Sequence, residues 1–214
     1  MRYKLEDICS LRKGKTDVAV LTAETYISTE NMLPNKAGVV NSSSLPSVTF
    51  TQKYKKGDVL VSNIRPYFKK IWKAKYDGGC SNDVLVFTSK GNTDEDFLYY
   101  VLADDAFFSY SMATSKGTKM PRGDKKSIMQ YEVPCYDIEI QKKIASVLKV
   151  MDEKIELNNA INNNLSAHSC IARIVAKQRR QISQTYECLH ACVKVYVRVD
   201  NEKTVKQFSS LQVA

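Results

Sequence analysis

The sequence lacks the residues and motifs from which most enzymes build a reaction centre. Its 214 residues include only two histidines, His168 and His190, and neither stands in a pattern that indicates acid–base catalysis. No Gly-x-Gly-x-x-Gly follows a predicted strand, and neither Asn-Pro-Pro-Tyr nor Asp-Pro-Pro-Tyr is present to hold a base for methylation. We therefore expect a non-catalytic chain that binds no cofactor of its own.

Long apolar runs are also missing. No segment approaches the roughly 18 consecutive apolar residues of a membrane span, and the charged start, Met1–Ser10, lacks the apolar core of a secretory signal. We expect a cytoplasmic protein that has no membrane partner and keeps its six cysteines reduced. The net charge of +9 indicates attraction to a polyanion, and nucleic acid is favoured because no basic amphipathic anchor opens the sequence.

Metal-binding patterns are sparse. Cys188, His190 and Cys192 offer three ligands without a fourth, so incidental thiols are the alternative to a metal site, and we expect no metal. Asp124-Lys125-Lys126 and Asp152-Glu153-Lys154 each match the acid-x-lysine half of a nuclease motif. No Pro-Asp partner accompanies them. A small metal-dependent nuclease is therefore retained only as an alternative function.

A basic stretch with interleaved aromatic residues runs from Lys53 to Lys75. It holds eight lysines and arginines against one acid, Asp58. Cationic side chains neutralise phosphates, while aromatic faces and guanidinium planes contact bases. A solvated pair of strands would have a similar composition. The predicted double-stranded DNA contacts in this stretch are Arg65, Tyr67, Lys69, Lys70 and Lys73.

Ser115–Lys126 is a second basic segment, which glycine and proline make extended and adaptable. A mobile surface loop without a ligand is the alternative interpretation. Because arginine can donate two hydrogen bonds to guanine, Arg65 or Arg122 is expected to read a base, whereas lysines hold phosphates. The predicted DNA contacts in this segment are Lys116, Lys119, Arg122 and Lys125.

Local patterns predict several strands before residue 90. Val59–Ile64 and Asp83–Thr88 are apolar runs typical of strands. Phe68–Lys75 alternates in a way that places three lysines on one face. Gly57-Asp58 and Asp77–Gly79 are predicted turns.

A helix is predicted from near Thr93. The sequence Thr93–Asp96 supplies an N-cap and acids suited to the positive end of a helix dipole. Apolar residues between Phe97 and Phe108 then provide a buried face. Strands followed by a helix predict an α+β fold with one mixed α/β domain.

A heptad pattern begins after Ile138. Apolar and amide residues recur at alternating steps of four and three, which is typical of a helix that packs on another helix. Consecutive seam asparagines weaken an isolated coiled coil, but polar seam residues can fix register between specific partners. The sequence thus predicts a long spacer helix of coiled-coil type. Its helix-packing residues are Ile144, Leu148, Met151, Ile155, Asn158, Asn162 and Leu165.

Three segments together, Lys56–Lys73, Ala113–Lys126 and Val133–Asn158, resemble the specificity (S) subunit of bacterial type I restriction-modification systems. The resemblance covers roughly residues 1–165, and its most diagnostic part is the helix that follows Val133-Pro134. It implies a target recognition domain that reads about half of a split DNA sequence, and a helical spacer that sets the distance to a second such domain. The partners it implies are DNA, a modification (methyltransferase) subunit and a restriction subunit. S-adenosylmethionine, ATP and Mg²⁺ are then expected on those partner subunits only.

The chain departs from the family in length, since a usual S subunit has two recognition domains and two spacers. We expect a recognition domain over residues 1–137, a helical spacer for dimerisation and partner binding over 138–185, and a tail of uncertain structure over 186–214. A half subunit could form a homodimer through antiparallel spacers, and a truncated product is the alternative. A non-DNA-binding helical assembly adaptor, with a basic face that only solubilises it, is the other alternative function.

Overall fold

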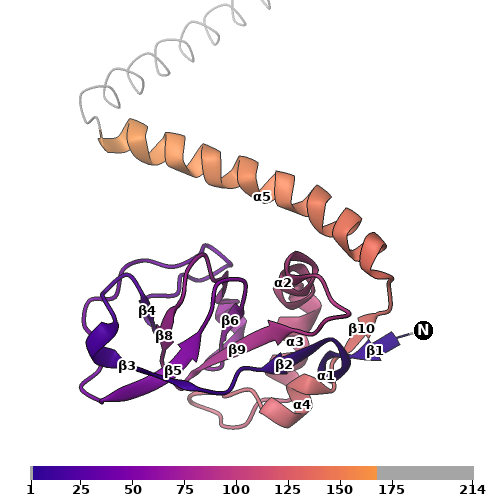
Figure 1. The fold of residues 1–214 in the computed structure, drawn as a ribbon, viewed down its shortest axis with the longest axis horizontal. Coiled ribbons are helices and arrows are strands. Elements are labelled where there is room, and N and C mark those ends of the chain that lie inside the picture. The colour runs from indigo at the N-terminus through magenta and orange to yellow at the C-terminus, as the bar shows by residue number, and fades with distance from the viewer. Residues whose placement is uncertain (1, 168–214) are drawn as a thin grey trace, which may run out of the picture. The chain divides into compact units, whose positions relative to one another are not determined.

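The computed structural model describes residues 2–167, whose arrangement is shown in Figure 1. One four-stranded antiparallel sheet has the order β2-β9-β6-β7. A second has the order β3-β5-β8-β4, in which β4 and β8 run parallel. A short ribbon pairs β1 with β10. The strands are β1 (Arg2–Lys4), β2 (Cys9–Leu11), β3 (Lys15–Asp17), β4 (Tyr26–Ile27), β5 (Phe50–Tyr54), β6 (Val59–Ser62), β7 (Ile71–Lys73), β8 (Gly78–Cys80), β9 (Val84–Ser89) and β10 (Glu132–Pro134).

The helices of the described part lie mainly after the sheets in sequence. The α-helices are α1 (Leu5–Ile8), α2 (Glu95–Ala103), α3 (Asp105–Ala113), α4 (Lys125–Met129) and α5 (Ile138–Ala167), and the 3-10 helices are η1 (Val18–Val20) and η2 (Pro66–Phe68). The α+β prediction for the recognition domain is confirmed. No helix among residues 2–167 is long and apolar enough to cross a membrane.

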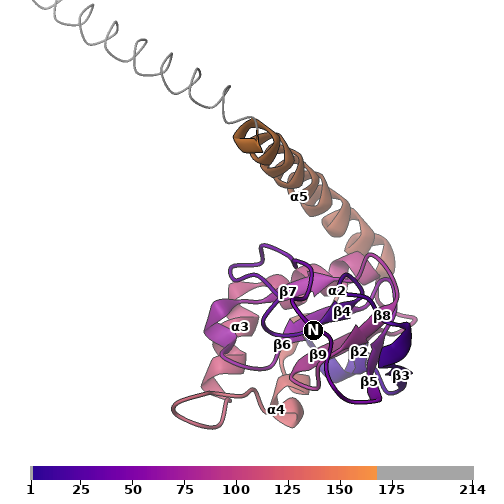
Figure 2. The same ribbon diagram turned by 90° about the vertical axis from the view of Figure 1, so that its left-hand side faces the viewer.

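The first sheet is the middle layer of the domain (Figure 2). All four residues of β6 are buried, and successive side chains of a strand point to opposite faces. Val59 and Val61 pack into the core beneath the helices, while Leu60 packs into the core beneath the second sheet. A strand covered on both sides has no solvated face, which explains the continuous apolar run predicted as a strand.

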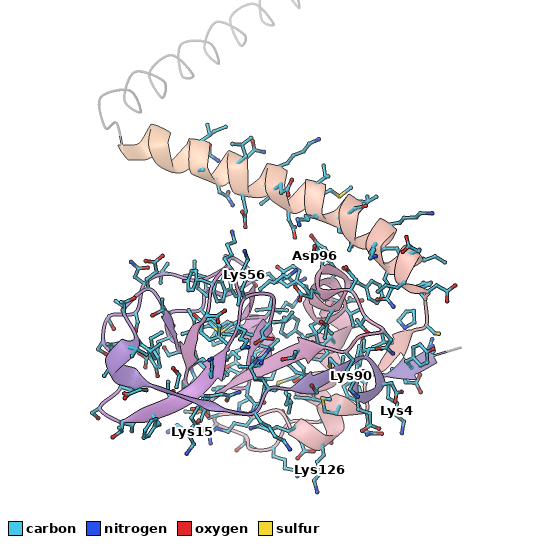
Figure 3. All side chains as sticks on the ribbon, viewed as in Figure 1. Lys4, Lys15, Lys56, Lys90, Asp96 and Lys126 are labelled. Carbon is cyan, nitrogen blue, oxygen red and sulfur yellow. The ribbon has the colours of Figure 1, made fainter. Side chains whose placement is uncertain are left out.

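Charged side chains lie around the rim of these layers. Lys4, Lys15, Lys56, Lys90 and Lys126 are at the outside of the domain, with Lys15 and Lys126 along the lower edge of the view and Lys56 along the upper edge (Figure 3). The fold thus places Lys15 and Lys56 at opposite edges of the domain.

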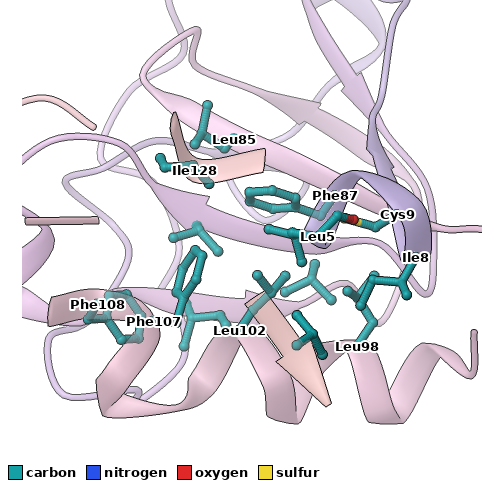
Figure 4. Close-up of a cluster of buried hydrophobic side chains, with 14 residues drawn as sticks. Leu5, Ile8, Cys9, Leu85, Phe87, Leu98, Leu102, Phe107, Phe108 and Ile128 are labelled. Carbon is teal, nitrogen blue, oxygen red and sulfur yellow. The ribbon is translucent and has the colours of Figure 1, made fainter. Parts of the chain in front are cut away.

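The larger core lies between the first sheet and the helices (Figure 4). Leu98 and Leu102 of α2 and Phe107 of α3 are at most 1% exposed and pack against Val61 and Phe87. Phe87 and Phe107 meet edge to face with ring centroids 6.5 Å apart, a favoured aromatic geometry. These contacts fix α2 and α3 on one face of the sheet.

The predicted strand over Phe68–Lys75 is wrong, and so is the lysine face derived from it. Pro66 begins the helix η2, and Lys69, which ends it, has a left-handed backbone with φ of +50°. Only Ile71–Lys73 forms a strand, and both Ile71 and Trp72 are buried on its opposite sides. The left-handed turn breaks the two-residue alternation, so Lys69 and Lys73 do not share a sheet face.

One predicted turn is confirmed and the other is wrong. Gly57 has φ of +90°, and Asp58 donates its N–H to the Lys55 carbonyl at 3.0 Å, as a tight turn requires. Gly78 and Gly79, in contrast, belong to strand β8. A Cβ at Gly78 would lie 2.3 Å from the Thr25 carbonyl oxygen, so glycine is needed there for close approach rather than for turning.

The predicted helix near Thr93 is confirmed, but it is two helices. Asp94 caps α2 by accepting N–H donors from Asp96 and Phe97, each at 3.0 Å. Asp104 then has an extended backbone and caps α3 by accepting the N–H of Ala106. Asp104 therefore divides the predicted helix into α2 and α3.

Helix α5 begins at Ile138, where the spacer was predicted to start. The first compact unit of the chain nevertheless extends to Asp152, and the second begins at Glu153. The first turns of α5 thus belong to the first compact unit, and the functional boundary expected after residue 137 stays a prediction. Residues 168–185 of the predicted spacer and the tail 186–214, with Cys188, His190 and Cys192, lie outside the described residues.

Gln141 fastens the first turn of α5 to the domain. Its side chain is 3% exposed. The amide oxygen accepts the N–H of Asp94 at 3.0 Å, and the amide nitrogen donates to the carbonyls of Asn92 at 3.2 Å and Tyr136 at 2.8 Å. The same residue therefore joins the start of α5 to the start of α2.

We predict that Gln141→Ala lowers the free energy of unfolding by about 1–3 kcal/mol, because it leaves three backbone groups at a partly buried site without this partner. Urea denaturation followed by circular dichroism would measure the change. Lys142→Ala is the matched control, since its side chain is exposed and has a polar contact with Glu139 at 3.4 Å. Equal stabilities for the two variants would contradict the role assigned to Gln141.

Candidate nucleic-acid interface

The structure brings the two predicted basic segments together. Ile64 and Arg122 form a β-bridge. Arg65 donates its N–H to the Pro121 carbonyl at 2.9 Å, and Gly123 donates its N–H to the Asn63 carbonyl at 3.1 Å. Residues 63–70 and 116–123 therefore form one continuous surface, which we call the Arg65–Arg122 face.

Local backbone geometry shapes this face. Lys116 and Arg122 exchange two backbone hydrogen bonds of 2.9 Å, so the predicted adaptable loop is closed into a hairpin. A Cβ at Gly123 would lie 2.7 Å from Ile128 Cδ1 and 2.8 Å from Asn63 Oδ1, so a larger residue there would require these side chains to shift. Within the described residues, Asn63 Oδ1 and Arg65 Nε are buried and have no hydrogen-bond partner. Arg65 also has φ of +50°, an uncommon conformation for a residue other than glycine.

Three of the six cations of the Arg65–Arg122 face, Lys69, Lys116 and Arg122, are paired with acids. Lys69 and Lys36 both contact Asp105 at 2.8 Å, and together they lower the pKa of Asp105 to about 2. Arg122 contacts Asp83 at 3.2 Å. The positive charge that DNA would meet here is thus smaller than the lysine and arginine count of the sequence suggests.

Two further members of this face are held in different ways. Lys116 contacts Asp124 at 3.2 Å, and the pKa of Asp124 is lowered to about 2, mainly by hydrogen bonds from Ser127 and then by Lys116. Lys70 donates to the Thr29 carbonyl at 2.6 Å, and burial lowers its pKa. Lys119 is exposed at the tip of the hairpin.

An exposed aromatic pair lies beside these cations. Tyr67 is 50% exposed and Phe68 is 38% exposed, and their ring centroids are 4.7 Å apart. Lys70 Nζ lies 5.8 Å from the Phe68 ring, within the range of a cation–π contact. Phe68 was missed as a site residue because the expected alternation assigned it to the apolar side of a strand.

Lys73 and Lys125 lie apart from this face. Lys73 contacts Asp96 of α2, and Lys149 of α5 contacts the other oxygen of that carboxylate at 3.3 Å. β7 pairs antiparallel with β6, so Lys73 lies at the opposite end of the sheet from Arg65. Lys125 lies at the rim of a separate pocket that also includes Lys13 and Lys15. Sequence reasoning missed these two lysines, although the Lys13-Gly14-Lys15 turn was a usable signal.

The predicted helix-packing residues differ in exposure. Ile144 and Leu148 are partly buried, next to the buried Gln141 and Ala145 of the same compact unit. Met151 and Ile155 are 56% and 57% exposed. Asn158 and Asn162 are exposed as well. Leu165 belongs to the helix, but its side chain is not among those that the structure describes. The helix is thus present, while its pairing with another helix stays a prediction.

Metal-ligand groups do not cluster in the described chain. Among residues 2–167, no three histidine, cysteine or acidic side chains are placed to hold a metal ion. In the acid-x-lysine patterns, Asp124 accepts two hydrogen bonds from Ser127, at 3.0 and 2.8 Å. Asp152 accepts a hydrogen bond from Tyr100. Both carboxylates already have structural partners, so the nuclease alternative is not favoured.

Comparison with known proteins connects this geometry to one family of curated relatives. The chain is 30% identical over 118 residues to the EcoDI specificity subunit of a type I restriction enzyme from Escherichia coli, an alignment that covers 51% of the chain and 26% of that protein. It is 28% identical over 172 residues to the HindI specificity subunit from Haemophilus influenzae, covering 76% of the chain and 37% of that protein. The chain thus spans well under half the length of either relative.

Solved structures show the same fold. The HsdS subunit from Thermoanaerobacter tengcongensis superposes with a TM-score of 0.56 at 18% identity, over 77% of this chain and 45% of that one. The type I restriction-modification S subunit from M. genitalium gives a TM-score of 0.55 at 19% identity, over 77% and 43%.

The family model describes a type I restriction modification DNA specificity domain, and it matches residues 1–167. That range includes both basic segments, the whole two-sheet domain and the described length of α5. The resemblance noted in the sequence is confirmed. Because the match extends over more than half of its length, the chain belongs to the type I restriction modification DNA specificity domain family.

Proposed function

We propose that this chain is the DNA-recognition subunit of a bacterial, cytoplasmic type I restriction-modification complex. It reads one half of a bipartite DNA target and positions the modification and restriction subunits on it. The observation that carries the proposal is the joining of the two basic segments through Arg65, Pro121 and Gly123 on a domain of the specificity family. Arg65 and Arg122 are the proposed base readers, and the lysines of the Arg65–Arg122 face hold phosphates.

The chemistry of the complex is proposed to belong to the partner subunits. S-adenosylmethionine, ATP and Mg²⁺ would bind there, and this chain would supply recognition only. Support comes from the two carboxylates of the nuclease-like patterns, since Asp124 caps α4 and Asp152 accepts a hydrogen bond from Tyr100. Neither carboxylate is available without losing a contact that the fold uses.

The chain is further proposed to work as a pair. Its described part contains one recognition domain and one long helix. Its alignment with the HindI specificity subunit covers 37% of that protein. Two copies joined through antiparallel α5 helices would present two recognition domains. A two-fold pair of this kind reads a palindrome of two half-sites separated by a fixed spacer.

We predict that the double substitution Met151→Lys and Ile155→Lys separates the pair into monomers, because it places two charges in an apolar helix contact. The dimer dissociation constant should rise at least about 100-fold, equivalent to about 2.7 kcal/mol. Sedimentation equilibrium would measure it. Ser146→Lys is the control, since the helical repeat places Ser146 on the opposite side of α5. An unchanged dimer in the double variant would contradict pairing through this side of the helix.

Co-expression with the adjacent modification subunit tests the function itself. The purified complex would methylate genomic DNA, and single-base sequencing would identify the modified sites. Methylation at one bipartite palindrome is the expected result. A stable complex without methylation would indicate a truncated remnant, and a chain that binds neither partner nor DNA would support the assembly-adaptor alternative.

A further inference from the structure

An open pocket lies beside the turn between β2 and β3. Its volume is about 450 Å³, and its walls come from residues 11–15, the first half of β5, Asn82 and Lys125. Leu85 and Val86 of β9 also line it. We call it the β2–β3 pocket. None of the predicted DNA contacts except Lys125 belongs to it.

The charge of this pocket is positive and unbalanced. Lys13, Lys15 and Lys125 are exposed, no ion pair joins any of them to an acid within the described residues, and no acidic residue lines the pocket. Its remaining cation, Arg12, is instead bound on two nitrogens by Asp58. The three lysines are thus available to an anion, in contrast to Lys69 and Arg122 on the neighbouring face.

The pocket is held open by backbone contacts on both sides. Arg12 donates its N–H to the Val86 carbonyl at 2.8 Å, and Lys53 donates its N–H to the Gly14 carbonyl at 3.1 Å. Gly14 has φ of +126°, which glycine adopts without strain. The turn that carries Lys13 and Lys15 is therefore fastened to both sheets before any ligand binds.

The pocket borders the Arg65–Arg122 face. Asn82 precedes Asp83, which contacts Arg122 and whose carbonyl accepts the N–H of Asn63 at 2.8 Å. Lys125 follows Arg122 by three residues. Lys15 and Lys126 also lie along the same edge of the domain, opposite Lys56 (Figure 3). A duplex lying on the face would thus pass the pocket.

We propose that the β2–β3 pocket binds phosphates of the DNA backbone through Lys13, Lys15 and Lys125. This inference rests on the proposed DNA-recognition function and adds a second place of phosphate contact to it. The pocket adds sequence-independent affinity to that of the face lysines, while Arg65 and Arg122 of the face read bases. Unpaired lysines are suited to the pocket's role because each binds phosphate as a point charge.

The test compares charge-neutral variants of the full chain in complex with its modification subunit. Fluorescence anisotropy would measure binding to a labelled 40-base-pair duplex of random sequence and to a duplex with the methylated site, over a series of salt concentrations. The variant is Lys13→Gln with Lys15→Gln. The matched control is Lys55→Gln with Lys56→Gln. It removes the same number of exposed lysines, and Lys56 lies at the edge of the domain opposite Lys15.

In the pocket variant, the slope of log K against log salt should fall by about 1.8, since each lost phosphate contact removes about 0.9. Affinity should fall roughly tenfold or more at 0.1 M salt, equally for both duplexes. Lys125→Gln should lower the slope by about 0.9. The control should match the wild type, and unchanged melting temperatures would show that all the variants fold.

Each contrary result has a distinct meaning. A wild-type complex that binds neither duplex overturns the proposed function as a whole. Normal wild-type binding with an unchanged slope in the pocket variant overturns the pocket inference alone. Loss of ATP or pyrophosphate binding in the pocket variant, with an unchanged DNA slope, would assign the pocket to a free phosphate compound and also overturn the backbone assignment.

Discussion

Replacing Asp58 by alanine is expected to lower the free energy of unfolding by about 3–5 kcal/mol, which is the usual cost of breaking a buried ion pair from one side. Asp58 is 3% exposed. Its carboxylate accepts hydrogen bonds from Arg12 Nη2 at 2.8 Å, from the Lys55 N–H at 2.7 Å and from Thr88 Oγ1 at 2.9 Å. It also accepts one from Arg12 Nε. The variant would leave four donors without this acceptor.

Chemical denaturation at neutral pH would measure the loss, with Asp77→Ala as the matched control. Asp77 is exposed and accepts the N–H of Lys56 at 2.8 Å, so its removal should cost at most about 1 kcal/mol. Arg12→Ala combined with Asp58→Ala should destabilise the protein less than Asp58→Ala alone, because no unpaired guanidinium remains. Similar stabilities for Asp58→Ala and Asp77→Ala would show that the Arg12 contact is unimportant.

Gly78→Ala is the second substitution with a large expected effect, a loss of about 3 kcal/mol at the upper end of typical overpacking costs. The added Cβ would lie 2.3 Å from the Thr25 carbonyl oxygen and 2.5 Å from the Tyr54 hydroxyl. The Thr25 carbonyl already accepts the N–H of Gly79 at 3.1 Å and the Tyr54 hydroxyl at 2.9 Å. Backbone therefore has to move, and the pairing of β4 with β8 should weaken.

Thermal unfolding would show the effect as a lower melting temperature. Gly91→Ala is the matched control, because a Cβ there meets nothing within 4 Å, and its stability should change by no more than about 1 kcal/mol. If Gly78→Ala had the same melting temperature as Gly91→Ala, β4 and β8 would be able to separate at little cost in free energy.

Features set by neighbouring residues were predictable from the sequence. The start of α5 at Ile138 and the cap at Asp94 each depend on a few consecutive side chains. The strand β6 was predicted from its apolar run and is confirmed over Val59–Ser62. Membership of the specificity family was also visible in the order and spacing of three segments.

Features set by distant contacts were not predictable. Gly78 was predicted to be a turn residue because the residues next to it in the sequence give no sign of the Tyr54 ring and the Thr25 carbonyl that pack against it. Lys69 was predicted to be a strand residue because its left-handed backbone is usually indicated by a glycine, and this position holds a lysine. Its pairing with Asp105 joins residues 36 positions apart, so charge counted along the sequence overestimated the charge available for DNA on the Arg65–Arg122 face.

The ribbon of β1 and β10 brings the two ends of the recognition domain together, since Arg2 pairs with Pro134 and Lys4 with Glu132 (Figure 1). A domain whose ends meet can be exchanged as a cassette through one point of attachment, without altering the length of the helix after it. Under the proposed DNA-recognition function, residues 2–152, which include the turns of α5 that Gln141 fastens to the domain, would carry their own target preference when grafted before the rest of α5 in a related protein. Sequence specificity and spacer length could then diversify by separate genetic events.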